Sequence, residues 1–423
     1  VGAGNKVEPR PITVSQAVGS DVVVEQGLKA GDQVVVENII KIRDQFQIAG
    51  GWGGGTFVGS VGVTLNNLSI KNFFKKGAWR PYPMGQNQRL SISAQTNGTY
   101  YKAFAISFTD PWMGGRKPNS FTISAHYSDE NNAYYAWQKG TRYFRTAGVA
   151  AGLGKRLDWP DPYFTFYAEA SYERYMLKDW NTFVLKNGAA NLLSIRLVLG
   201  RNSVDQPIYP RRGSDFSVSV QLTPPYSLWD GKDYKSTALS EQERYNWIEF
   251  HKWMLKGQWF TPLTRNGNLV LVARAEMGYL GHYNKNKVSP FERFEVGGDG
   301  MTGYNMYGID IISMRGYDDG ALDPVGSNYS CAYNKYTMEL RYPLLLKGQT
   351  NIYVLGFLEG GNGFTSWKEF SPFKIKRSAG IGVRLFLPVV GMVGVDWGWG
   401  FDPAAGQTKR SGSHIHFTMG MQF

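Results

Sequence analysis

The residues with the clearest chemical potential lie in the stretch Ser313–Asp319, which reads Ser-Met-Arg-Gly-Tyr-Asp-Asp. This stretch belongs to the longest segment without strand-like alternation, at about 288–334. An arginine between an apolar residue and Gly-Tyr, in a glycine-rich loop, is poorly explained as solvent-exposed filler. A guanidinium forms strong paired hydrogen bonds with carboxylates. Arg315 therefore indicates a loop that folds inward and pairs with carboxylates inside a hollow protein.

The other residues that could do chemistry form no recognisable catalytic or metal site. The five histidines are dispersed, at His126, His251, His282, His414 and His416. His414 and His416 share a strand face, but two ligands without a third are better explained as polar residues that line a lumen. There is no phosphate-binding loop, no nucleophile elbow and only one cysteine, Cys331. We therefore expect no cofactor, no metal, no disulfide and no enzymatic activity.

The composition favours a transmembrane β-barrel, although the mean hydropathy of the chain is negative. Aromatic residues make up 15% of the 423 residues, and 51 residues are glycine. Such an excess, combined with many short alternating segments, is typical of outer-membrane barrels with aromatic girdles. These barrels escape hydropathy plots because only every second residue of a strand faces lipid.

The clearest strand pattern lies at the end of the chain. One face carries Phe423, Met421, Met419, Phe417 and Ile415, and the other carries Gln422, Gly420, Thr418, His416 and His414. This alternation has the length of a tilted membrane strand, about ten residues. Similar alternation recurs within 164–173, 215–222, 269–277 and 335–342.

A soluble sandwich or propeller could show the same alternation in each strand. The number of repeats and the aromatic residues at strand ends favour the membrane barrel. Residues 44–423 contain about sixteen strand candidates, an even number that suits a closed antiparallel barrel. We therefore predict a 16-stranded antiparallel transmembrane β-barrel with a long inward-folded loop.

The first barrel strand is expected to be weak. The alternating residues Phe46 and Ile48 are followed by Gly50, Gly51, Trp52, Gly53, Gly54 and Gly55. Each glycine in a strand costs about 0.5–1 kcal/mol relative to alanine. Closure of the barrel would pair this strand with the last one, so we predict a lateral seam. Its two sides are Phe46, Ile48, Gly50, Gly51, Trp52 and Gly53, and Ile415, Phe417, Met419, Met421 and Phe423. The alternative is a loop or bulge that begins early.

The formal charge of +12 arises entirely in residues 44–423, because residues 1–43 contain five basic and five acidic side chains. The positive charges are scattered among strands and turns and form no recognition helix or stripe, so a nucleic-acid partner is not expected. Anionic lipid headgroups and lipopolysaccharide phosphates account for them better.

Residues 1–43 form a separate, short β-rich segment, with strands expected at 9–14, 21–25 and 33–37. The segment resembles the membrane-proximal region of periplasmic adaptor subunits of tripartite efflux pumps. It is too short to form the adaptor's helical hairpin or lipoyl-type domain, so no efflux function follows. A fusion, an assembly artefact and a borrowed β-module remain open. The sequence starts at Val1 without signal-peptide features, which places any signal peptide outside it or removes it by processing.

Residues 44–423 resemble the barrel domain of the BamA family of outer-membrane protein assembly factors, within the bacterial surface antigen superfamily, particularly its Bacteroidetes-type members. The resemblance is carried by Asn66–Gly77, Phe108–Trp112, Tyr209–Gly213, Arg293–Gly298, Met314–Tyr317, Arg377–Arg384 and the terminal Phe423.

The resemblance implies an integral protein of the Gram-negative outer membrane that folds and inserts other β-barrels without covalent chemistry. Its partners would be nascent outer-membrane proteins, accessory assembly lipoproteins and lipopolysaccharide. A client strand would pair at the open seam, which is β-augmentation. Met314, Arg315, Gly316 and Tyr317 correspond to the family's loop motif, Glu359 matches its acidic partner, and Asp396 is a weaker candidate.

The sequence departs from the family pattern in one respect. POTRA domains precede the barrel in the family, whereas the adaptor-like segment stands there in this sequence. An alternative function on the same fold is a passive pore or a two-partner secretion conduit. A conduit should have an evenly strong seam, whereas an insertase should have few hydrogen bonds between its first and last strands.

Overall fold

The computed structural model describes most of the chain. The described residues are 13–18, 21–26, 45–53, 56–79, 82–98, 100–114, 119–133, 140–300, 309–326, 329–347, 350–387 and 391–419, with side chains from residue 61 onward except at 97, 347, 387 and 419. The chain divides into two units, Val1–Arg43 and Asp44–Phe423. In the first, strands β1 (Thr13–Val18) and β2 (Asp21–Gln26) form an antiparallel hairpin. Of the strand expected at 9–14, residues 13 and 14 lie in β1 and the rest is outside the described residues, as is the strand expected at 33–37.

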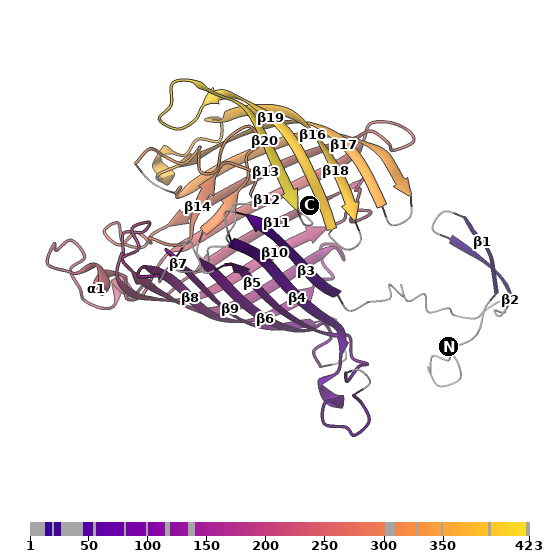
Figure 1. The fold of residues 1–423 in the computed structure, drawn as a ribbon, viewed down its shortest axis with the longest axis horizontal. Helices are drawn as coiled ribbons and strands as arrows, with labels where there is room; N and C mark the ends of the chain where they lie inside the picture. The colour runs from indigo at the N-terminus through magenta and orange to yellow at the C-terminus, as the bar shows by residue number, and fades with distance from the viewer. Residues whose placement is uncertain are drawn as a thin grey trace. The chain divides into compact units, whose positions relative to one another are not determined.

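The second unit is built on one 16-stranded sheet, as predicted. Strands that are neighbours in the sheet order pair antiparallel, and the sheet curls around a lumen (Figure 1). The strands are β3 (Gln45–Gly53), β4 (Thr56–Leu68), β5 (Gln88–Asn97), β6 (Tyr101–Asp110), β7 (Asn119–Asn131), β8 (Tyr143–Arg156), β9 (Phe164–Lys178), β10 (Gly188–Asn202), β11 (Gly213–Leu222), β12 (His251–Pro262), β13 (Val270–Gly281), β16 (Ala332–Lys347), β17 (Thr350–Phe364), β18 (Lys376–Leu387), β19 (Gly391–Pro403) and β20 (Arg410–Met419).

The two faces of the sheet differ as the alternation predicted. On β16, Met338 and Leu340 are exposed on the outer face, whereas Glu339 and Arg341 are buried on the inner face. Ile195 on β10 and Ile415 on β20 are likewise exposed. An exposed apolar outer face around a polar interior is the reverse of a soluble core and suits a wall surrounded by lipid.

The two longest connections of the sheet, β11–β12 and β13–β16, lie at the same end of the barrel. This end carries the β11–β12 connection, with the 3₁₀ turn η2 (Tyr226–Leu228) and helix α1 (Glu241–Tyr245), and the β17–β18 connection with η3 (Trp367–Glu369). The turn η1 (Ile70–Asn72) follows β4 at the opposite end. None of the described helices is long and apolar enough to cross a membrane.

The longest connection joins β13 to β16 and contains two strands that the sequence analysis missed. Strands β14 (Arg293–Val296) and β15 (Ile309–Ile312) pair parallel, and β16 begins at Ala332, inside the stretch expected to lack strands. Each strand has only four residues, too few for a period-two pattern to stand out. The connection packs through Phe291, Phe294 and Met314 into a buried aromatic cluster.

The outer face provides a test of the membrane wall. Ile195 lies in the middle of β10 and is 55% exposed. We expect Ile195→Arg to destabilise the barrel in lipid vesicles by about 2–4 kcal/mol, because the charge would face hydrocarbon near the bilayer midplane. Urea unfolding followed by heat-modifiable gel mobility measures this. Ser217→Arg, at a position that lines a lumen cavity, is the control and should change stability far less. Equal effects of the two variants would contradict the assignment of the faces.

Candidate functional site

The loop that follows β15 lies against the inner wall at Gly316. Gly316 has a φ of +87°, in the left-handed region that favours glycine. A Cβ on Gly316 would lie 2.8 Å from the Cβ of Ser378 and 3.0 Å from the backbone nitrogen of Gly400. Only glycine therefore allows the loop to approach β18 and β19 this closely, and this approach places Arg315 inside the lumen.

Arg315 is held mainly by Glu359 on β17. Its Nε and Nη2 atoms donate to Glu359 Oε1 at 3.0 and 2.6 Å, and its backbone N–H donates to Glu359 Oε2 at 2.9 Å. Both side chains are nearly inaccessible to solvent. Charged groups buried in this way need close pairing, because removal from water costs several kcal/mol per ion.

A second carboxylate, which the sequence analysis missed, also binds Arg315. Glu339 on β16 accepts from Arg315 Nη2 at 2.8 Å. The sequence showed Glu339 on a polar strand face, but the depth of the loop and the register of β16 with β17 decide its partner. Asp396 on β19 is more distant, with 3.7 Å between its Oδ2 and Arg315 Nη1. The guanidinium also stacks on Phe357, 3.7 Å from the ring centroid.

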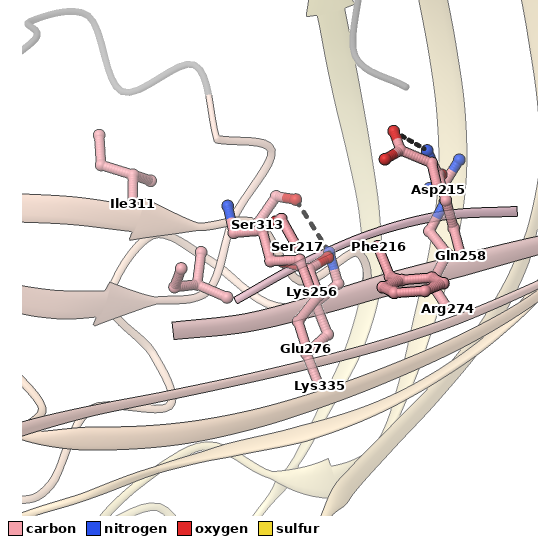
Figure 2. Close-up of a pocket in the computed structure, with 12 residues that line it drawn as sticks. Asp215, Phe216, Ser217, Lys256, Gln258, Arg274, Glu276, Ile311, Ser313 and Lys335 are labelled. Atoms are coloured by element: carbon pink, nitrogen blue, oxygen red, sulfur yellow. Dashed lines mark hydrogen bonds and ion pairs between the residues drawn. The ribbon is translucent and has the colours of Figure 1, made fainter. Parts of the chain in front are cut away.

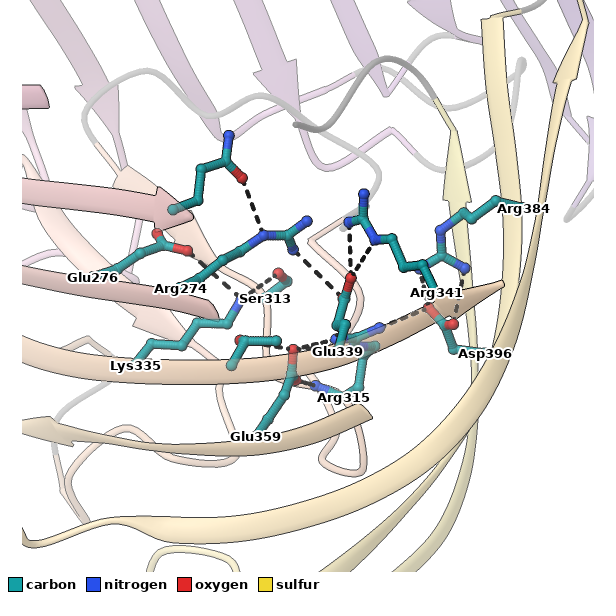
Figure 3. A network of polar contacts seen from close by, with 12 residues as sticks. Arg274, Glu276, Ser313, Arg315, Lys335, Glu339, Arg341, Glu359, Arg384 and Asp396 are labelled. Carbon is teal, nitrogen blue, oxygen red and sulfur yellow. Dashed lines mark hydrogen bonds and ion pairs between the residues drawn. The ribbon is translucent and has the colours of Figure 1, made fainter. Parts of the chain in front are cut away.

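These pairs belong to a larger charged network on the inner wall (Figure 3). Glu339 Oε2 accepts from Arg341 at 2.9 and 2.7 Å, and Asp396 accepts from Arg384 at 2.8 and 2.7 Å. The Nη1 atom of Arg274 lies 3.6 Å from Oε1 of Glu339. The network spans β13 and β16 to β19, so the loop arginine is shared by several strands.

The remaining motif residues extend the contact to the last strand. The Gly316 N–H donates to His416 Nε2 on β20 at 2.8 Å, so this imidazole is neutral and carries its proton on Nδ1. The Tyr317 hydroxyl donates to the carbonyl of Arg377 on β18 at 2.9 Å. Met314 is fully buried, and its N–H donates to the Gly298 carbonyl. The sequence placed His416 on the lumen side but gave no sign of its partner.

A cavity of about 470 Å³ lies in the lumen beside this network (Figure 2). Its charged lining is mixed and consists of Asp215, Lys256, Arg274, Glu276 and Lys335. Among the described residues, no group of His, Cys, Asp or Glu side chains could hold a metal ion. The lumen can therefore hold the inward-folded loop and polar solvent.

The first and last strands of the sheet, β3 and β20, each have only one paired neighbour among the described residues. The sheet order begins at β20 and ends at β3, and no pairing joins the described parts of these two strands. Phe46, Ile48, Gly50, Gly51, Trp52 and Gly53 all lie in β3. The glycines continue the strand, since Gly50 and Gly51 pair with Gly59 and Val58. The early-loop alternative is therefore wrong within the described part of this segment.

On the other side of the seam, the outward direction of β20 is as the alternation indicated. Ile415 and Phe417 are 66% and 58% exposed. Met419 ends the strand, and Met421 and Phe423 lie outside the described residues.

The fold and the sequence identify the class of the protein. Residues 84–423 match the Omp85 superfamily domain, so the chain belongs to the Omp85 superfamily. It is an integral β-barrel protein of the outer membrane of a Gram-negative bacterium.

Among individual relatives, the outer membrane protein assembly factor BamA of Neisseria meningitidis is 23% identical over 316 residues, which cover 70% of this chain and 32% of that protein. The crystal structure of Haemophilus ducreyi BamA lacking POTRA domains 1–3 has a TM-score of 0.59 and 16% identity, covering 97% of this chain and 74% of that one. CdiB from Escherichia coli has the same fold, with a TM-score of 0.54, 12% identity and coverage of 97% and 67%.

The N-terminal unit has a different relationship. Residues 1–41 match the C-terminal permuted SH3 domain of RND membrane fusion proteins. The multidrug efflux pump subunit AcrA of Escherichia coli is 52% identical over 48 residues, which cover 11% of this chain and 12% of that protein. The chain thus spans about a third or less of the length of these curated relatives.

Removal of Arg315 should destabilise the barrel. We expect Arg315→Ala to cost about 3–5 kcal/mol, because it leaves Glu359 buried without its main partner. Arg315→Lys should restore stability only partly, since lysine keeps the charge but lacks the planar fork. Urea midpoints in detergent measure both. Arg377→Ala, which breaks an exposed ion pair with Asp402, is the control and should cost less than about 1 kcal/mol. We call the contacts of Arg315, Gly316 and Tyr317 with the inner wall the brace. Wild-type stability of both Arg315 variants would show that the brace does not stabilise the barrel.

The long loop should also respond to pH through Asp323. Burial raises the pKa of this carboxyl to about 8, although Ser330 and the Val296 N–H donate to it. The folded loop therefore keeps a proton that the unfolded chain releases at about pH 4. Because the unfolded state binds fewer protons in between, stability should fall as pH rises toward 8 and then level off.

The measurement is thermal unfolding across this pH range. Asp323→Asn should flatten the dependence, and Asp158→Asn, at an exposed turn, should leave it unchanged. A slope that persists in Asp323→Asn would assign the pH dependence to another group.

Proposed function

We propose that this barrel folds and inserts other β-barrel proteins into the outer membrane, without covalent chemistry. The unpaired seam carries the proposal. Among the described residues, β3 and β20 are the two ends of a sheet in which every other neighbouring pair is hydrogen-bonded. An unpaired strand edge is a template for another strand, and a client's strand can add there by β-augmentation.

The composition of β3 supports this function. Gly50, Gly51 and Gly53 give the strand few side chains for cross-strand packing. A permanent closure would need the opposite, a strand rich in β-branched and aromatic residues. A weak edge can exchange its partner, which insertion of a client requires.

The brace also supports the proposed function, because it stabilises the wall beside the seam. Arg315, Gly316 and Tyr317 contact β16, β17, β18 and β20, so the wall on one side of the seam stays in register without help from β3. A barrel with an open seam needs such internal support. The proposed partners are nascent outer-membrane β-barrel proteins and accessory assembly lipoproteins, with lipopolysaccharide at the outer surface.

A second candidate function is a protein secretion conduit. The fold is shared with CdiB, and the lumen contains a cavity of about 470 Å³. A conduit conducts through its lumen and gains nothing from a weak seam. The two functions therefore differ in whether the seam must open.

A disulfide across the seam separates them. We expect cysteines at Ile48 and at the facing position near Phe417, oxidised in liposomes, to block insertion of an unfolded client, and reductant to restore it. The reason is that a locked edge cannot accept a client strand. Protease protection of the inserted client is the measurement.

The matched control places cysteines at Leu197 and Val220, which already face each other across β10 and β11. This pair should leave insertion intact, because it locks strands that are paired anyway. Full insertion by the seam-locked protein would favour the conduit.

A further inference from the structure

The turn between β4 and β5 has a surface that the proposed function does not use. In Figure 1 it projects from the sheet as a separate indigo-to-purple protrusion, at the end opposite to α1. Phe74 at its tip is 92% exposed, and Trp79 is 54% exposed. Phe73 beside them is also exposed. Exposed aromatic residues grouped in this way indicate an interaction site more than a solvated turn.

The aromatic tip is held in a defined arrangement. The ring centroids of Phe73 and Phe74 are 5.3 Å apart, and those of Phe73 and Trp79 are 5.0 Å apart. The Trp79 indole N–H donates to the Phe73 carbonyl at 3.0 Å. These rings pack on one another and leave their outer surfaces free, so the apolar area is presented outward.

The base of the turn is fastened to the barrel. The Ser69 N–H donates to the Pro83 carbonyl at 2.9 Å, and the Ile70 N–H donates to Gln88 Oε1 at 2.8 Å. The Asn67 side chain accepts from the N–H groups of Gly85 and Asn87 at 3.2 and 3.0 Å. The tip is therefore a fixed projection of the wall, built by side chains that cap its backbone groups.

The charge of the turn is of one sign. Lys71, Lys75 and Lys76 are exposed around the aromatic residues. No aspartate or glutamate occurs between Asp44 and Asp110. Lysines with long apolar stems beside Trp and Phe are the residues that lie at membrane interfaces, where the ring enters the headgroup layer and the ammonium contacts phosphate.

The position of the turn is also consistent with contact with the membrane surface. It lies at the end of the barrel opposite to the two longest connections, and the long loops of outer-membrane barrels are extracellular, so this end faces the periplasm. It continues directly from β4, a strand of the lipid-facing wall. Trp112 in the β6–β7 turn and Trp159 in the β8–β9 turn are also exposed at this end. The turn thus directly adjoins the exposed apolar outer face of the wall.

We infer that this turn forms an anchor that inserts into the periplasmic leaflet of the outer membrane and binds anionic phospholipid headgroups. The anchor consists of Phe73, Phe74 and Trp79, with Lys71, Lys75 and Lys76. The hairpin of β4 and β5 adjoins β3. The anchor therefore fixes the first-strand side of the seam to the leaflet surface.

Site-directed spin labelling of the full chain tests the anchor. Phe74→Cys carries a nitroxide, and Asn266→Cys, in the exposed β12–β13 turn at the same end, is the matched control; the native Cys331 is buried. Both are reconstituted in vesicles of phosphatidylcholine with and without phosphatidylglycerol. We expect the label at 74 to be relaxed several-fold more by oxygen relative to a water-soluble nickel chelate than the label at 266. The difference should increase with phosphatidylglycerol.

A second variant separates the lysines from the rings. Replacement of Lys71, Lys75 and Lys76 by glutamine should abolish the effect of phosphatidylglycerol, while the barrel keeps its heat-modifiable mobility. Labels at 74 and 266 that are equally accessible to nickel in both vesicle types would overturn the inference. A label at 74 that is water-accessible in vesicles but protected in native outer membranes would point to a protein partner and would also overturn it.

Discussion

The contact between Arg315 and its carboxylates is the interaction on which the interior of the barrel depends. A guanidinium in a nearly dry position is stable only when its charge and donors are matched. Glu359 accepts hydrogen bonds from both the backbone and the side chain of Arg315, and Glu339 accepts another. One loop residue thereby links β16 and β17 inside the lumen. Loss of the arginine would leave Glu359 buried without its main partner, whereas Glu339 would keep its pairing with Arg341.

The close approach at Gly316 makes this pairing possible, and the pairing in turn stabilises the approach. The gap between the loop and β19 admits no side chain, because Gly398 and Gly400 oppose Gly316. Glycines on both surfaces cost backbone entropy. The buried charge pairs and the hydrogen bond from Gly316 to His416 offset that cost. The close approach of the loop and the pairing of its charge therefore depend on each other through Arg315, Gly316 and His416.

The barrel was readable from the sequence because its rule is local. Alternate residues of each strand meet lipid or lumen, so Met338 and Glu339 reveal their faces without knowledge of any partner. The resemblance to a known family indicated that Arg315 pairs with Glu359. Glu339 and His416 were missed as partners, because their contacts depend on the register of β16 and on the path of the loop through the lumen. Strands β14 and β15 were missed because four residues carry too little pattern and their parallel pairing is set by the packing of the loop.

The distribution of carboxylates explains why the two sides of the seam differ. Glu339, Glu359 and Asp396 lie on β16, β17 and β19, and each one pairs with arginine on the inner wall. In contrast, no acidic residue occurs between Asp44 and Asp110, the segment that contains β3 to β5 and nearly all of β6. An inward arginine of the loop would find no carboxylate partner on β3, β4 or β5. The brace can therefore stiffen only the C-terminal side of the seam, and the glycine-rich first strand stays free of it. The charge pattern thus makes the barrel rigid on one side of its seam and leaves the other side available for exchange.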